Sequence, residues 1–390
     1  MDAYFSAWVV DFGDYKVTPW TVEGSVDYER LVKEFGVSRI TGDLRAKLKR
    51  LAGDLHPFIS REFYYAHRDL DLVLEDIEGG KGFFLYTGIA PSRGPMHLGH
   101  LPSFLLTQWF QERFGVNAYI MIPDEEKYLA KKVDSLRDVD ERVREVERII
   151  ASLGFDPDRT FLFRDREYIY HLYDAAVTVA RRINYSVAKA VFGFTGETSI
   201  GLIFYPALQI VPTLFEKKRP LIPCAIDQDP YWRIQRDIAE SLGYYKTATI
   251  LSKFVPPLLG EGKMSASDPR SAIYLTDDEQ TIRRKISAAL TGGAPTAAEQ
   301  RKHGGNPDVC IVYRWHALFQ PEDESVADIY KKCREGKLIC GDCKKMLADL
   351  IVDFVQGLRE RAEKADKVLE KIKYSGKLAR RMWEWEFEVP

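Results

Sequence analysis

The stretch that decides the fold runs from Lys81 to His100 and reads Lys-Gly-Phe-Phe-Leu-Tyr-Thr-Gly-Ile-Ala-Pro-Ser-Arg-Gly-Pro-Met-His-Leu-Gly-His. Its first part, Gly82–Gly88, is a compact apolar run that ends in Gly, which indicates a buried strand. A loop rich in Gly, Pro and Ser follows, and helical spacing begins at Leu98. A buried strand, a tight turn and a helix in this order are typical of a parallel sheet covered by helices.

The same alternation continues downstream. Further strands are expected at 117–122, 160–163 and 220–226, and helices at 98–114, 137–153, 167–190 and 230–242. We therefore predict an α/β fold whose catalytic domain, residues 76–276, is a doubly wound parallel sheet of the Rossmann-like kind. Only helical spacing follows, which predicts an all-α C-terminal domain with a tail over 277–390. Residues 1–75 are expected to form a small N-terminal appendage packed on the sheet domain.

Composition narrows the class of protein. The chain has 390 residues, 45% hydrophobic and 29% charged, with 56 Lys plus Arg against 58 Asp plus Glu, a formal net charge of −2. Such a chain is neither disordered nor a polybasic nucleic-acid binder. No run approaches the ~20 apolar residues that cross a bilayer, and the start of the chain lacks the pattern of a signal peptide. The odd number of cysteines, 5, does not suggest an oxidising compartment. We expect a cytoplasmic protein with no membrane partner.

Two histidines carry the first chemical signal. His97 and His100 flank Gly99 at the point where a helix begins. Glycine lets a ligand approach the backbone, a helix N-terminus favours an anion, and imidazole N–H groups can donate to phosphate oxygens. An isolated His-x-x-His is more often a packing pair, but two of only 7 histidines lie at this one turn.

A second signal lies at Gly262-Lys-Met-Ser-Ala-Ser-Asp268, a loop of small residues with one lysine. Gly and Ser supply backbone N–H and hydroxyl donors, and Lys263 supplies a mobile positive charge, a combination that suits a pyrophosphate leaving group. Taken alone, this segment is explained equally well as a flexible surface loop.

Together, His97-Leu-Gly-His100 and Lys263-Met-Ser-Ala-Ser267 resemble the two signatures of class I aminoacyl-tRNA synthetases. From about residue 17 to about residue 357 the chain is similar to the tryptophanyl-tRNA synthetases of the archaeal and eukaryotic-cytoplasmic kind. The segments that carry this resemblance are Pro19-Trp-Thr-Val22, Leu85-Tyr-Thr-Gly88, Asp124-Glu-Glu-Lys-Tyr128, Phe192-Gly-Phe-Thr195, Ile222-Pro-Cys-Ala-Ile-Asp-Gln-Asp-Pro-Tyr231 and Gly304-Gly-Asn306. The run Cys224–Tyr231 and the form of the second signature favour this family over tyrosyl-tRNA synthetases, which share the fold.

The resemblance implies the chemistry of that family. ATP and L-tryptophan would react to tryptophanyl-adenylate and pyrophosphate, and the amino acid would then move to the 3′ end of tRNA(Trp), with no covalent intermediate on the enzyme. It assigns catalysis to His97, His100 and Lys263. It assigns ATP binding to Gly88, His97, Gly99, His100, Lys263, Met264, Ser265 and Ser267. It assigns tryptophan binding to Tyr86, Glu126, Lys127, Gln209, Asp227, Gln228 and Trp232. Mg²⁺ is expected with ATP, bound mainly through phosphate oxygens, and no residue is assigned as a metal ligand. A homodimer is also implied.

Three positions depart from the family. Met121 stands where eukaryotic relatives carry a Gln that shares the indole N–H, so we expect Tyr86 alone to accept that bond. Ile89 replaces an Arg of some relatives, which leaves the contacts of its loop with ATP open. Ala294-Pro295 departs from relatives in the loop that faces the anticodon, which leaves anticodon reading open.

Two features of the C-terminal region allow more than one interpretation. Between Lys331 and Arg381, fifteen Lys and Arg outnumber eight Asp and Glu, an excess of +7 that suits tRNA phosphates or, equally, a solvated helix face. Cys333, Cys340 and Cys343 cluster, with a CxxC spacing at the last two. A metal would need a fourth ligand, so a packing role is favoured.

Three alternatives compete with the ligase interpretation. One is tyrosyl-tRNA synthetase, and another is a free-standing nucleotidyltransferase, whose fold shares the His-x-Gly-His turn. The helical C-terminal region and the lysine loop argue against the nucleotidyltransferase. The third is a catalytically silent tRNA- or protein-binding paralogue, which would require damage to His97, His100 or Lys263, and all three are present.

Overall fold

The computed structural model describes residues 10–11, 15–17, 22–24, 26–260, 262–264 and 268–388. Its centre is a seven-stranded sheet in the order β4-β5-β10-β9-β6-β7-β8. The parallel strands are β6 (Phe83–Gly88), β7 (Ala118–Ile122), β8 (Thr160–Arg164), β9 (Arg219–Ala225) and β10 (Ala248–Ser252). β5 (Tyr64–Arg68) and β4 (Ser38–Arg39) extend one edge of the sheet in antiparallel pairing. The predicted α/β fold with a mostly parallel sheet is therefore confirmed.

The strand order reverses direction at the centre of the sheet. From β6 the chain proceeds outward through β7 to β8, then returns to the other side of β6 to form β9 and β10. The crevice at the carboxyl ends of β6 and β9 is therefore the switch point at which doubly wound sheets bind ligands. Four strands, β6 to β9, begin and end within two residues of their predicted ranges.

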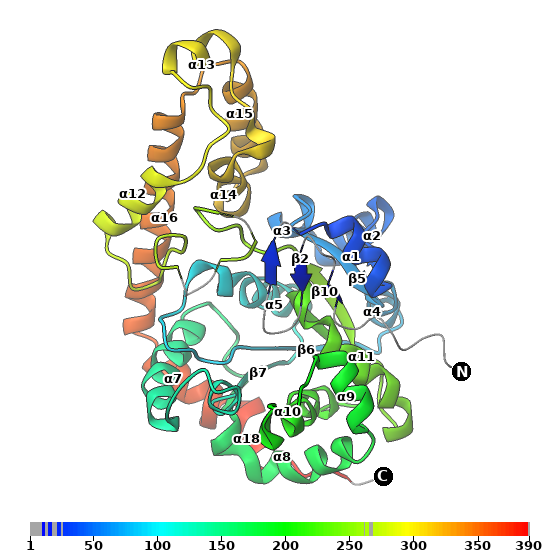
Figure 1. Cartoon of the computed structure of the whole chain (residues 1–390). Coiled ribbons are helices and arrows are strands. Elements are labelled where there is room, and N and C mark those ends of the chain that lie inside the picture. The colour runs from blue at the N-terminus through cyan, green and yellow to red at the C-terminus, as the bar shows by residue number, and fades with distance from the viewer. Residues whose placement is uncertain are drawn as a thin grey trace.

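Helices cover both faces of the sheet (Figure 1). In β6, Phe83 and Leu85 belong to the apolar cluster that includes residues of α5 (Leu101–Phe114), whereas Phe84 and Tyr86 belong to the opposite cluster. That second cluster includes residues of α8 (Asp165–Ala180), α10 (Ile200–Ile210) and α11 (Asp229–Ile238). Because successive residues of a strand point to opposite faces, a strand buried on both faces must be apolar throughout. This explains the uninterrupted apolar run in the sequence.

The helical region projects from one side of the sheet domain (Figure 1). It contains α12 (Glu279–Ala288), α13 (Ala297–His303), α14 (Ile311–Phe319), α15 (Asp323–Arg334) and α16 (Cys340–Glu363). Helix α16 is 24 residues long and contacts both α12 and α7 (Leu136–Ala151), which belongs to the sheet domain. This single helix therefore joins the two regions.

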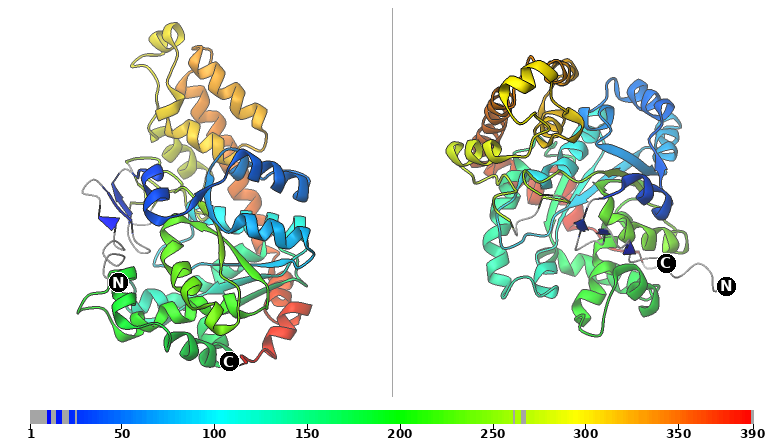
Figure 2. Two further views of the ribbon diagram at one scale, coloured as in Figure 1. Left: turned by 90° about the vertical axis from the view of Figure 1, so that its right-hand side faces the viewer. Right: turned by 45° about the horizontal axis from the view of Figure 1, so that its top comes forward.

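The two ends of the chain pack against the sheet domain. Strands β4 and β5, from the segment expected to be an appendage, complete the central sheet, and α1 (Tyr28–Phe35), α2 (Gly42–Ala52), α3 (Pro57–Ser60) and α4 (Leu70–Glu78) surround them. A separate small sheet contains β1 (Val10–Asp11), β2 (Tyr15–Val17) and β3 (Val22–Gly24). After α17 (Asp366–Glu370), helix α18 (Lys377–Trp383) packs against β8. The left view of Figure 2 shows this end of the chain in red at the base of the sheet domain. In the part of the chain that the structure describes, no helix has the length and apolar character to cross a bilayer.

Candidate active site

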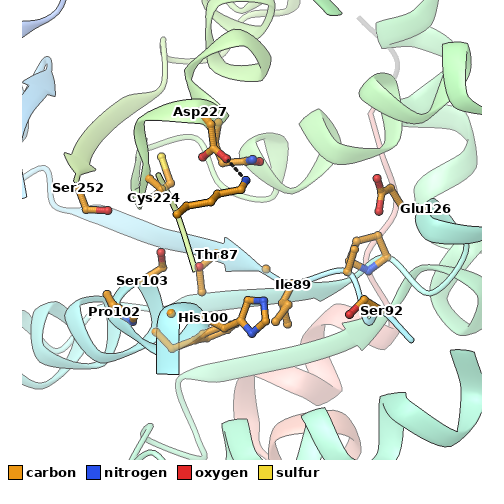
Figure 3. A pocket seen from close by; sticks show the side chains of 18 of the residues that line it. Thr87, Ile89, Ser92, His100, Pro102, Ser103, Glu126, Cys224, Asp227 and Ser252 are labelled. Carbon is orange, nitrogen blue, oxygen red and sulfur yellow. Dashed lines mark hydrogen bonds and ion pairs between the residues drawn. The ribbon is translucent and has the colours of Figure 1, made fainter. Parts of the chain in front are cut away.

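A cavity of about 660 Å³ opens at the carboxyl ends of β6, β7 and β9, which is the switch point of the sheet (Figure 3). The residues singled out from the sequence that line it are Tyr86, Gly88, His97, Gly99, His100, Met121, Glu126, Lys127, Gln209, Asp227, Gln228, Trp232, Lys263 and Met264. Ser265 and Ser267 lie outside the described residues, as do residues 19–21 of the N-terminal resemblance. The structure thus brings together two motifs that are more than 160 residues apart in the sequence.

The histidine turn has a defined geometry. The rings of His97 and His100 stack with their centroids 3.7 Å apart, and the backbone N–H of His97 donates to Nδ1 of His100 at 3.1 Å. When neutral, His100 therefore carries its proton on Nε2. Burial, and next the positive charge of Lys263, lowers the pKa of His97 to about 4. Burial also holds the pKa of His100 well below its usual range. Both rings are neutral at pH 7 and act as hydrogen-bonding groups rather than cations.

The two motifs meet at Gly99. A Cβ atom at this position would lie 2.9 Å from Nδ1 of His97 and 3.4 Å from Cβ of Met264. The backbone of Met264 is fixed by an N–H bond to the carbonyl of Val255 at 3.2 Å. Only a residue without a side chain leaves the backbone of the turn accessible between the imidazole and the second motif.

Two lysines in the cavity are paired with buried carboxylates. Lys263 Nζ lies 3.1 Å from Oδ2 of Asp227, the ion pair drawn as a dashed line in Figure 3. Lys127 Nζ lies 2.7 Å from Oε2 of Glu126. Lys132, which the sequence analysis did not single out, also lines the cavity, and burial and the charge of Lys127 lower its pKa. The cavity therefore concentrates positive charge, held in place by carboxylates.

The other end of the cavity is aromatic. The Tyr86 hydroxyl donates to the backbone carbonyl of Gln209 at 3.0 Å and also lies 2.9 Å from Sδ of Met121. The Tyr86 ring meets the ring of Trp232 edge to face, with the centroids 5.6 Å apart. Because the hydroxyl proton is directed at a protein acceptor, the lone pairs of the hydroxyl oxygen are left to accept a bond from a ligand donor.

A carboxyl pair beside the cavity was missed by the sequence analysis. Glu125 follows β7, and Asp165 follows β8, so both lie at the carboxyl ends of neighbouring strands. Burial raises the pKa of Asp165 well above its usual range, with Glu125 adding to the effect, and burial raises the pKa of Glu125 to about 7. The pKa shifts follow from burial and from mutual repulsion, because two adjacent buried carboxylates cannot both ionise readily. The rule that polar residues follow strand ends could have found them, but no motif marks them.

Comparison with known proteins relates the whole chain to one family. Residues 80–356 match the family model of class I tRNA synthetases (W and Y). A tryptophan–tRNA ligase from Thermococcus onnurineus is 53% identical over 377 residues, which cover 95% of this chain and 97% of that protein. One from Saccharolobus solfataricus is 50% identical and covers 95% of this chain and 98% of that protein. The crystal structure of tryptophanyl-tRNA synthetase from Plasmodium falciparum superimposes with a TM-score of 0.85 at 34% identity, covering 91% of this chain and 99% of that one.

Proposed function

The chain belongs to the class I aminoacyl-tRNA synthetases of the tryptophan and tyrosine family and is a tryptophan–tRNA ligase, and on that premise we propose what each group in the cavity does. The predicted function is confirmed, and the tyrosine-specific, nucleotidyltransferase and catalytically silent alternatives are set aside. The enzyme joins L-tryptophan to ATP and passes the activated amino acid to tRNA(Trp). We place it in the cytoplasm, where aminoacyl-tRNA is consumed by ribosomes.

The convergence of the two motifs on one cavity carries the assignment of the ATP site. The phosphates of ATP lie over the turn at His97 and His100, whose neutral rings donate through N–H groups without adding charge of their own. Gly88, Gly99 and Met264 let ATP approach the backbone, and Ser265 and Ser267 add hydroxyl donors.

Lys263 is the mobile charge of the reaction. In the structure it pairs with Asp227, and on ATP binding it moves to the β- and γ-phosphates, which are the leaving group. Its positive charge stabilises the negative charge that grows on pyrophosphate as the tryptophan carboxylate attacks the α-phosphorus. Catalysis by this enzyme is then positioning and electrostatics, with no nucleophile of its own.

The donor set fits ATP accompanied by Mg²⁺. Glu126 and Asp227, two carboxylates that line the cavity, are both paired with lysines. The ligands of the ion would therefore be mainly phosphate oxygens of ATP rather than protein side chains, as is usual for Mg²⁺. Bound Mg²⁺ would neutralise phosphate charge, and Lys263 would add to that neutralisation.

Tryptophan occupies the aromatic end of the cavity. The Tyr86 hydroxyl oxygen accepts from the indole N–H, and the ring of Trp232 packs beside it. The α-ammonium group is surrounded by polar side chains of the cavity, those of Glu126, Gln209, Asp227 and Gln228. Lys127, which lies beside Glu126, attracts the α-carboxylate group of the same ligand.

The helical region binds the anticodon arm of the tRNA.

Two chains form a homodimer. Support for the dimer comes from α8, on which Tyr170, Tyr173 and Val177 are exposed on one face of the helix. Ile200, at the start of the neighbouring α10, is 85% exposed. Large apolar side chains gathered on adjacent helices mark a protein interface.

The assignment of Lys263 is tested by Lys263→Ala in tryptophan-dependent ATP–pyrophosphate exchange. We expect kcat to fall by about 10²–10³-fold, the usual effect of removing one charge-stabilising donor. The KM for tryptophan should change little, because Lys263 contacts the leaving group. Lys246→Ala is the matched control, since Lys246 pairs with Glu240 on the surface at 3.1 Å. A Lys263→Ala enzyme with the kcat of the wild type would contradict the assignment.

A further inference from the structure

A short stretch of chain, residues 271–277, lies between the second motif and α12, and we name it the connecting segment. Its first residue is tied to the end of the second motif, because the backbone N–H and the hydroxyl of Ser271 both donate to the carbonyl of Asp268, at 3.0 and 2.8 Å. Helix α12 follows at Glu279. The connecting segment therefore leads from the lysine loop directly into the helical region.

The middle of the connecting segment is paired with the histidine turn. The backbone N–H of Leu98 donates to the carbonyl of Ile273 at 3.0 Å, and the N–H of Leu275 donates to the carbonyl of Met96 at 2.8 Å. These two bonds lie on either side of His97 and form an antiparallel bridge between the two backbones. Because the turn is bonded to the connecting segment on both sides of this histidine, a shift of the segment moves the histidine as well.

A lysine of α12 holds the connecting segment from the side of the helical region. Lys285 Nζ lies 2.6 Å from Oδ2 of Asp277 and donates to the carbonyl of Ala272 at 2.9 Å. The same carboxylate oxygen accepts the backbone N–H of Tyr274 at 2.9 Å. The side chains of Lys285 and Asp277 are only 11% and 12% exposed. One ammonium group therefore joins both ends of the segment.

An arginine of α16 binds the same segment. Nε of Arg359 donates to the carbonyl of Leu275, and Nη2 donates to the carbonyl of Asp277 at 2.5 Å. A planar guanidinium group presents its donors in a rigid fork, so it fixes the two carbonyls relative to each other. The segment that pairs with the histidine turn is therefore anchored to two helices of the helical region.

We propose that Lys285 and Arg359 are positioning residues for the reaction with ATP. They hold the connecting segment so that the histidine turn and the end of the second motif keep a fixed relation across the phosphates. Neither side chain is among the described residues that line the catalytic cavity, so both act through the segment. This inference rests on the proposed placement of the phosphates of ATP over His97 and His100.

The proposal predicts which kinetic constants depend on the two residues. The histidine turn contacts ATP, and a displacement of about 1 Å at a reacting centre can cost about 10²-fold in rate. The tryptophan end of the cavity is built by Tyr86, Gln209 and Trp232, which belong to β6, α10 and α11. Loss of the anchors should therefore lower kcat and raise the KM for ATP, while the KM for tryptophan stays that of the wild type.

Lys285→Met, which keeps the length of the side chain and removes its charge, tests this in tryptophan-dependent ATP–pyrophosphate exchange with the full-length chain. We expect kcat to fall roughly 10- to 100-fold. Circular dichroism and thermal melting check that the variant is folded at the assay temperature. Arg359→Met breaks the second anchor independently and should show the same division between kcat and the KM for tryptophan, so it carries the test if Lys285→Met does not fold. Arg359→Lys keeps a donor and the charge and should recover part of the lost kcat.

Arg283→Met is the matched control. Arg283 is also on α12, and its Nη1 lies 2.6 Å from Oδ1 of Asp349 on α16, so this variant loses a contact between the same two helices but no bond to the connecting segment. It should keep the kcat of the wild type.

Wild-type kcat in folded Lys285→Met and Arg359→Met would overturn the positioning role. An equal loss of kcat in Arg283→Met, or a KM for tryptophan that rises as much as kcat falls, would also overturn it. A wild-type enzyme without any exchange would instead refute the proposed placement of ATP.

Discussion

The hydroxyl group of Tyr86 has two protein neighbours, and its oxygen can still accept a hydrogen bond from a ligand. Its proton is directed at the carbonyl of Gln209, 3.0 Å away, and Met121 stands on its other side. Methionine has no strong acceptor, so it cannot share the indole N–H as an amide side chain could. In the site that we propose, recognition of the indole N–H would therefore depend on this single oxygen.

Tyr86→Phe tests the role of this hydroxyl group. Removing the hydroxyl leaves a buried indole N–H unpaired, which costs about 1–3 kcal/mol. We therefore expect kcat/KM for tryptophan to fall by roughly 5- to 150-fold, mostly through a higher KM. Tyr119→Phe is the control, because the hydroxyl of Tyr119 binds Glu216 at 2.7 Å, away from the cavity. An unchanged KM for tryptophan in Tyr86→Phe would refute a sole acceptor.

Individual residues also show that the basic excess between Lys331 and Arg381 overstates the positive charge exposed to a ligand. Lys373 contributes to the basic excess of the C-terminal region, yet it is 7% exposed and binds Glu147 at 2.7 Å. Arg359, another member of that excess, donates to the backbone carbonyl of Asp277 at 2.5 Å. Part of the excess therefore serves packing between the two regions. The sequence could not reveal this, because it depends on how the end of the chain docks on α7.

Among the secondary-structure elements, the strands that the sequence predicted differ in residue pattern from those that it missed. β6, β7, β8 and β9 are apolar runs followed by turn or polar residues, so the sequence marks both the strand and its end. β10 includes the polar residues Thr249 and Ser252 in its five residues, and β5 mixes aromatic and basic residues at the antiparallel edge. These two strands form because neighbouring strands of the sheet pair with them, and their own residue pattern does not mark them as strands. The cavity could be predicted because it lies where the marked strands end.

The buried carboxyl groups of Glu125 and Asp165, each just after a strand, should make the stability of the protein depend on pH. The pKa of Glu125 is raised from 4.5 to about 7 in the folded protein, so the folded state binds more protons than the unfolded state in that window. The free energy of unfolding should therefore fall as the pH rises from 4.5 to 7. Burial also holds the pKa of Asp165 well above its usual range, so Asp165 adds to this loss of stability. Asp165→Asn removes that second group and should make the fall smaller.

Calorimetric melting temperatures at pH 5 and pH 8 measure the effect. Wild type should lose more stability between the two values than Asp165→Asn does. Asp174→Asn, on the exposed side of the same helix α8, is the control and should follow the wild type. Equal pH dependence in Asp165→Asn and wild type would show that the pKa of Asp165 is not raised.

In the whole molecule, the sheet region, the helical region and the C-terminal segment are packed against one another. α16 runs from the helical region onto α7, and the Tyr168 hydroxyl binds the backbone carbonyl of Met382 near the end of the chain. The division into a sheet region and a helical region followed from the loss of strand signals. The return of α18 to β8 could not be predicted, because no local pattern records which distant face a short helix covers.

The exposed apolar face of α8 and α10 predicts a dimer in solution. Sedimentation equilibrium of the wild type should give twice the chain mass of 44.8 kDa. Tyr173→Glu places a charge on that face and should shift the protein toward the monomer, because burying an unpaired charge at an interface is costly. A wild-type enzyme that sediments as a single chain would contradict the dimer.

We propose that one cavity, built by two distant motifs, activates tryptophan with ATP. ATP–pyrophosphate exchange by the purified wild-type chain measures this step without tRNA. We predict exchange that depends on L-tryptophan, with L-tyrosine supporting no more than the background without amino acid. Exchange driven by tyrosine, or no exchange with either amino acid, would contradict the account.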